Sequence, residues 1–346
     1  MTIPPGPPYG YGHPPPPPPP KPGVIPLAPL GFGTVLTGAF STVGRYWKQL
    51  LGVAAVSYVG ALLVIGATVG IAYAVVGDHV TTLWNLPDGQ DARWEDVLPL
   101  IIGFGCVWAV AMLSLLCANT LVTAACPAVV QEAVLGRPTT FGTVWRRAWS
   151  RLPAVFGTVL LTTLALMLPL VLLMATFVSL ALAVADSESG LSVTPLLTVG
   201  GALALTPLAC WLWVKFSFAP AAAVIESQGA LASMRRSSHL VRGSWWRLFA
   251  CLLAAGLMAG VVGALIQQVF SLIASAPLAA VDFSGDDRNT LLVSVVVLLG
   301  VLAVGQAVGQ GIVSVFPPLV TALLYVDQRI RKEDLAADLV RAAGPS

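Results

Sequence analysis

Residues 99–125 read PLIIGFGCVWAVAMLSLLCANTLVTAA, a run without a single charged side chain. A helix of about 20 such residues crosses the hydrocarbon core of a bilayer. Comparable apolar runs occur near residues 50–76, 154–183, 196–218, 249–275 and 291–317. Together these runs predict an all-α integral membrane protein with six transmembrane helices.

The composition of the whole chain excludes a water-soluble protein. Of its 346 residues, 57% are hydrophobic and 10% are charged, whereas soluble domains carry about 25% charged residues. The five cysteines are an odd number, lie in apolar runs and form no Cys-x-x-Cys pair. We therefore expect buried free cysteines, with no disulfide, no metal site and no cofactor.

The charged residues are divided unequally between the two sides of the predicted membrane domain. The connections after the first, third and fifth runs carry ten acidic and two basic residues, and the rest of the chain carries sixteen basic and six acidic ones. Because basic connections stay in the cytoplasm, both termini are predicted to be cytoplasmic.

The ends of the chain differ in character from the apolar runs. Residues 1–30 contain 14 of the 27 prolines, which predicts a disordered or polyproline II tail. Such a tail either docks in an aromatic groove of a protein partner or is passive. The six-span domain is expected over residues 31–335, followed by a C-terminal cytoplasmic tail over residues 336–346.

An internal repeat defines the building unit of the predicted membrane domain. Phe32-Gly33-Thr34-Val35 recurs as Phe141-Gly142-Thr143-Val144, and a weaker third copy begins near Gly229. The repeats span about residues 31–135, 138–228 and 229–335. Each is expected to consist of an amphipathic interfacial helix that runs straight into an outward span, an acidic loop and an inward span. The inward spans share a proline followed by an acidic residue, in the pairs Pro127 and Glu132, Pro220 and Glu226, and Pro318 and Asp327.

Arginines gather on one face of the second and third amphipathic stretches, opposite an aromatic or apolar face. Lipid headgroups are the nearest anions at such a position, so we predict contacts with anionic lipids of the inner leaflet and no nucleic-acid partner. A purely topological role during insertion stays open as the alternative. The candidate residues are Arg146, Arg147, Arg151, Arg235, Arg236, Arg242 and Arg247.

Polar side chains inside the spans are rare and therefore informative. We expect them to form hydrogen bonds between helices, and the alternative is a substrate site. Lys215 lies close enough to the inner end of its span to reach the headgroups. The set comprises Asn119, Lys215, Gln267, Gln268, Gln306 and Gln310.

Small-residue motifs in three spans permit close packing of helices. They are Gly66-x-x-x-Gly70, Gly256-x-x-x-Gly260 and Gly305-x-x-x-Gly309. In a chain with 33 glycines such matches arise easily, so we interpret them as packing motifs without a further role.

Several of these segments also carry a resemblance to a known family. They are Phe32-Gly33-Thr34, Phe218-Ala219-Pro220-Ala221, Ser233-Met234-Arg235-Arg236-Ser237 and Leu323-Leu324-Tyr325-Val326-Asp327. Over about residues 29–340 the chain resembles actinobacterial multi-pass proteins labelled "glycerophosphoryl diester phosphodiesterase membrane domain". The resemblance implies the membrane region alone, without the catalytic barrel of some relatives.

The histidines do not match the chemistry of that barrel, which requires carboxylates that hold a metal and histidines that move protons. His13 lies in the proline-rich tail and His239 in the third basic stretch. His79 follows Asp78 in what we expect to be a solvated outer loop.

These features predict a non-enzymatic, multi-pass protein of a bacterial plasma membrane that organises lipids or partner proteins. A small-molecule or lipid transporter built on three parallel repeats is the first alternative, and a membrane enzyme is the second. A transporter requires a water-filled route lined by the polar residues of the spans. An enzyme requires acidic residues or histidines clustered at one depth.

Overall fold

The computed structural model describes residues 30–84, 93–185, 193–279 and 288–333. The predicted tails and most of the acidic connections lie outside these ranges. Within them all regular structure is helical. The helices are α1 (Phe32–Trp84), α2 (Trp94–Val134), α3 (Phe141–Ala185), α4 (Val193–Phe216), α5 (Ala219–Ile225), α6 (Ala230–Val241), α7 (Trp245–Ala279), α8 (Arg288–Val313) and α9 (Phe316–Glu333).

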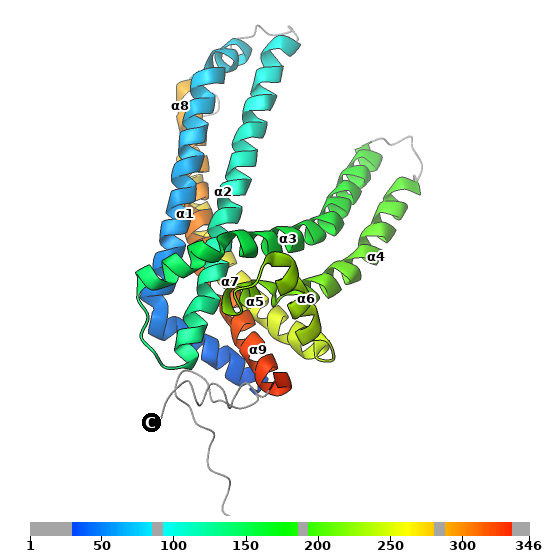
Figure 1. The fold of residues 1–346 in the computed structure, drawn as a ribbon. Coiled ribbons are helices and arrows are strands. Elements are labelled where there is room, and N and C mark those ends of the chain that lie inside the picture. The colour runs from blue at the N-terminus through cyan, green and yellow to red at the C-terminus, as the bar shows by residue number, and fades with distance from the viewer. Residues whose placement is uncertain (1–29, 85–92, 186–192, 280–287, 334–346) are drawn as a thin grey trace, which may run out of the picture.

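The long helices associate as sequential pairs. The most extensive helix contacts join α1 to α2, α3 to α4, and α7 to α8. Figure 1 shows α1, α2 and α8 side by side, while α3 and α4 diverge from them on the other side of the molecule. Consecutive long helices therefore pack on each other, as short connections between antiparallel helices require.

The protein core lies at one end of these pairs, which we call the base. It consists of α5, α6 and α9 with the adjoining ends of α1, α2, α3 and α7 (Figure 1). Phe218 and Tyr325 are fully buried there and contact each other edge to face, with ring centroids 5.9 Å apart. Ala221, Ala222 and Ala223 of α5 are also buried. These small side chains allow the helices of the base to approach closely.

Away from the base, the helices expose apolar side chains. Leu63, Phe104 and Leu265 are each more than 60% exposed. Such a surface is unstable in water and matches the interior of a bilayer. The segments that are long and apolar enough to cross a membrane are Phe32–Leu83, Trp94–Val134, Thr206–Ile225, Trp245–Ser275 and Val293–Glu333. The chain is therefore an all-helical membrane protein with five candidate spans in its described residues. The predicted span over residues 154–183 lies in α3, and many side chains of this helix are not among those that the structure describes.

The three amphipathic stretches join the long helices in different ways. The first continues into α1 through a kink at Tyr46, whose φ of −117° and ψ of 22° are not helical. The second continues into α3. The third forms the separate helix α6, because Gly243 adopts a φ of +85° and the chain turns before α7. The prediction that every stretch runs straight into a span is thus wrong for the third.

Only one of the three small-residue motifs makes the close contact that was expected of it. A Cβ atom added to Gly305 would lie 2.5 Å from Cβ of Phe270, so α7 and α8 approach each other closely there. Added Cβ atoms on Gly66, Gly70, Gly256 or Gly260 would meet no described atom within 4 Å. These four glycines thus make no close helix contact, which their spacing alone does not reveal.

Candidate functional site

A buried carboxylate in the base holds the start of the described chain. Asp327 of α9 is 0% exposed and accepts a hydrogen bond from the backbone N–H of Leu30, at 2.7 Å. The guanidinium groups of Arg247 and Arg331 donate to the same carboxylate, at 2.8 and 3.1 Å. Both arginines also donate to the carbonyl oxygen of Leu30, each at 2.7 Å. The buried negative charge is thus compensated by two guanidinium groups, as burial of an ion requires.

A second ionic cluster connects α6 to α9. Arg236 donates through Nε to Glu226, at 2.9 Å, and through Nη2 to Glu333, at 2.7 Å. The Tyr325 hydroxyl donates to Glu226, and Arg329 donates to Glu333 at 2.9 Å. The hydrogen bond to Glu333 and the neighbouring carboxylates raise the pKa of Arg236, although burial opposes the shift. Arg236 therefore remains charged inside the cluster.

The structure shows protein partners for four of the seven arginines of the predicted basic faces. Arg236 and Arg247 pair with carboxylates inside the base. Arg147 lies 3.8 Å from Glu132, and Arg151 donates to the carbonyl oxygen of Ser227 at 3.2 Å. The remaining candidates, Arg146, Arg235 and Arg242, are exposed, and their guanidinium groups have no protein partner in the described part of the chain.

The carboxylates beside Arg147, Arg236 and Arg247 belong to the acidic residues that follow the three shared prolines. Glu132 faces Arg147 and Glu226 pairs with Arg236, which are equivalent positions in successive repeats. Sequence reasoning noticed the recurring acids but did not join them to the arginines, because the two groups come from different repeats. Pro127, Pro220 and Pro318 also line one cavity of about 180 Å³.

The polar residues of the spans do not converge on one site. Within the described residues the side chains of Asn119, Gln267, Gln268, Gln306 and Gln310 form no hydrogen bond, and Gln268, Gln306 and Gln310 are exposed. The prediction of interhelical hydrogen bonds is thus wrong for these amides in the described structure, and the exposure of Gln268, Gln306 and Gln310 explains it for those three. Lys215 lies in the last turn of α4, as expected.

The Asp78-His79 pair lies within α1 and not in a loop. Nδ1 of His79 is 3.2 Å from Oδ1 of Asp96, so the imidazole joins the far ends of α1 and α2. The described residues contain no group of three or more histidines, cysteines or acids placed to hold a metal. Cys126 is buried, as predicted, whereas Cys106 is exposed on α2.

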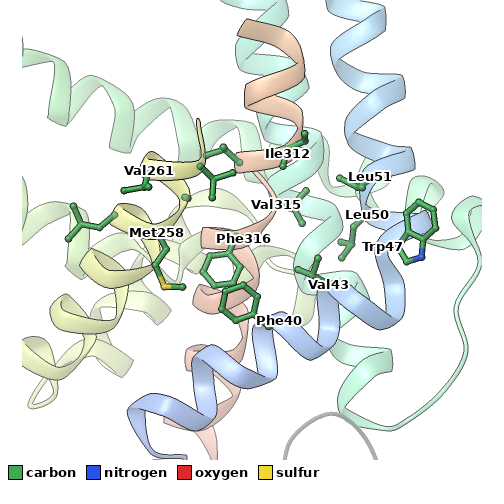
Figure 2. A pocket seen from close by; sticks show the side chains of 14 residues that line it. Phe40, Val43, Trp47, Leu50, Leu51, Met258, Val261, Ile312, Val315 and Phe316 are labelled. Atoms are coloured by element: carbon green, nitrogen blue, oxygen red, sulfur yellow. The ribbon is translucent and has the colours of Figure 1, made fainter. Parts of the chain in front are cut away.

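An apolar groove of about 580 Å³ lies between α1 and α7. Both helices pack on the α8–α9 junction, which closes the groove from the third side (Figure 2). Phe40 of α1 contacts Phe316 of α9 in a tilted arrangement, with ring centroids 4.7 Å apart. Every lining residue is hydrophobic, namely Phe40, Val43, Trp47, Leu50, Leu51, Leu257, Met258, Ala259, Val261, Val262, Ile312, Val313, Val315 and Phe316.

Sequence reasoning did not find this groove, because its lining residues are ordinary constituents of apolar runs. The groove arises from the kink at Tyr46, which changes the direction of α1 beside Phe40, Val43 and Trp47. A volume of this size is within the range of about 300–1,000 Å³ that is usual for small-molecule sites.

Comparison with known proteins places the chain in a family. No curated protein and no solved structure matches it. The model of the domain of unknown function DUF7847 matches residues 52–328, from within α1 to the residue after the buried Asp327. Since this match covers most of the chain, the protein belongs to the DUF7847 family.

Proposed function

We propose that this protein is a non-enzymatic plasma-membrane protein that holds lipid in the groove between α1 and α7. The observation that carries the proposal is the lining of the groove, which consists only of hydrophobic residues. A cavity without polar groups does not hold ordered water. In a helix bundle surrounded by lipid, the available apolar occupant is an acyl chain.

The rim of the groove supplies groups suited to a lipid headgroup. Trp47 lines the groove, and Nζ of Lys48 lies 5.7 Å from the centroid of its indole. Arg45 is exposed one residue before the kink, with its guanidinium 5.8 Å from the ring centroid of Tyr46. A lipid tail in the groove would thus place its headgroup near two cations, which favour an anionic lipid.

The proposed architecture has six spans in three parallel hairpins, with the base and both termini in the cytoplasm. Three features support it: the sequential pairing of long helices, the equivalent Glu132–Arg147 and Glu226–Arg236 contacts, and the excess of basic residues outside the acidic connections. The resemblance to the membrane region of phosphodiesterase-associated proteins agrees with this architecture and stays a prediction. A transporter of polar solutes is less well supported, because the polar residues of the spans do not line a common cavity.

Filling the groove tests the proposal. Met258 of α7 lines the groove, and Met258→Trp should occupy much of its volume. We expect protein purified in mild detergent to lose most of its retained lipid, as measured by native mass spectrometry. Leu265→Trp is the matched control, because Leu265 is on the same helix, is 64% exposed and does not line the groove. Equal lipid retention by the two variants would refute the proposed site.

A further inference from the structure

Another cavity lies between the end of α4, α6 and the start of α7. Its volume is about 420 Å³, and we call it the α4–α6–α7 pocket. Trp211 and Lys215 of α4 form one wall, Ser238 of α6 lies opposite, and Arg242 and Trp245 flank the turn between α6 and α7. The pocket therefore combines two cations with two indole rings.

Neither cation of the pocket is neutralised by the protein. Nζ of Lys215 lies 4.2 Å from the ring centroid of Trp211, and no described carboxylate pairs with it. Arg242 is exposed and likewise has no ion pair in the described residues. The nearby Arg236 and Arg247, in contrast, are both paired with carboxylates. The positive charges of Lys215 and Arg242 thus remain uncompensated, whereas those of Arg236 and Arg247 are neutralised by carboxylates.

Trp245, which lines the pocket, has an indole N–H that is buried and lacks a hydrogen-bond partner. An anion in the pocket would compensate Lys215 and Arg242 at the same time. The turn at Gly243, whose added Cβ would meet no atom within 4 Å, leaves space beside these groups.

We propose that the α4–α6–α7 pocket binds the phosphate group of an anionic phospholipid. Lys215 and Arg242 supply the positive charge, and the side chains of Trp211 and Trp245 line the pocket beside them. A lipid source is indicated by Trp211 and Trp246, which are 44% and 76% exposed on the same end of the molecule. Exposed tryptophans of this kind are typical of the membrane interface. The inference rests on the proposed placement of the bundle in a membrane, but it does not depend on the groove between α1 and α7.

The test measures the binding of phosphatidylglycerol and of phosphatidylcholine to the purified full-length protein in mild detergent, by native mass spectrometry. Lys215→Gln and Arg242→Gln should each weaken the preference for phosphatidylglycerol about fivefold, since a cation near an anionic surface contributes about 1 kcal/mol. Lys215→Arg should retain it. Arg235→Gln is the matched control, because Arg235 is exposed and unpaired on α6 but does not line the pocket.

The outcomes separate this site from other sources of binding. If inorganic phosphate competes in the wild type but not in the Lys215→Gln/Arg242→Gln variant, the pocket binds phosphate from a soluble source as well. If the pocket variants lose no more affinity than Arg235→Gln, the proposal is overturned. Met258→Trp should keep the headgroup preference, so failure of the groove proposal and failure of this one are distinguishable. Thermal unfolding in detergent checks that each variant remains folded.

Discussion

At the scale of single residues, Asp327 is a fully buried charge that requires compensation within the base. Its carboxylate is fully removed from solvent, yet Arg247 and Arg331 remain 30% and 36% exposed. Loss of the negative charge would leave two guanidinium groups beside each other and beside the carbonyl oxygen of Leu30. The charge, and not only the shape of the side chain, is therefore required.

Asp327→Asn should destabilise the protein by about 3 kcal/mol, near the lower end for breaking a buried pair because both arginines keep access to solvent. Unfolding in detergent micelles measures the change. Glu333→Gln serves as the control, since Glu333 is 26% exposed and the loss of a partly exposed pair costs about 1 kcal/mol or less. Similar losses for the two variants would show that the burial of Asp327 carries no special weight.

At the scale of the helical elements, α7 and α8 depend on the absence of a side chain at Gly305. Phe270 occupies the space that a Cβ atom at Gly305 would need. Because the near atoms include Cβ of Phe270, rotation of the ring alone cannot make room. The two helices would have to separate.

Gly305→Leu should therefore cost about 1–3 kcal/mol, the usual penalty for overpacking. The same substitution at Gly300 should be tolerated, because no described atom lies within 4 Å of a Cβ added there. Partial recovery of stability in Gly305→Ala/Phe270→Ala relative to Gly305→Ala would locate the clash. A Gly300→Leu variant as unstable as Gly305→Leu would argue against this explanation.

The elements could be predicted well from the sequence, because a long uncharged run such as residues 99–125 has few stable environments other than a membrane. The contacts between elements could not. The exposed Gln306 and Gln310 share a face, but helical spacing does not say whether that face meets another helix or lipid. The pairing of Arg236 with Glu226 likewise depends on how α6 folds back on α5.

The candidate sites were less accessible to sequence reasoning than the fold. Lys215 and Arg242 were both identified, one as a polar residue of a span and the other as a headgroup contact. Only the structure brings them to one pocket, because the turn at Gly243 sets the direction of α7 relative to α6. The groove gave no signal at all, since Met258 and Val261 are as common in helix cores as in binding sites.

At the scale of the whole molecule, the two ends of the helix pairs differ in charge. Glu95 and Asp96 lie at the start of α2, far from the base, whereas most of the described arginines lie in the base. This separation predicts that the base faces the cytoplasm. In a cysteine-free variant, Glu95→Cys should react with an impermeant thiol reagent on intact cells.

Thr140→Cys, which is exposed between α2 and α3, should react only after the cells are permeabilised. Labelling with the opposite sidedness would reverse the proposed orientation. It would leave the pairing of the helices unchanged, because that pairing does not depend on the direction of insertion.

The hold on Leu30 has a mechanical consequence. Both backbone groups of this residue are bonded to side chains of α7 and α9, so residues 1–29 are attached at a fixed point. A chain of that length reaches at most about 100 Å when fully extended. Any protein bound by the proline-rich segment would be held within that distance and thus at a raised local concentration beside α9. A force that pulls on this segment would act first on the hydrogen bond between Leu30 and the Asp327 carboxylate.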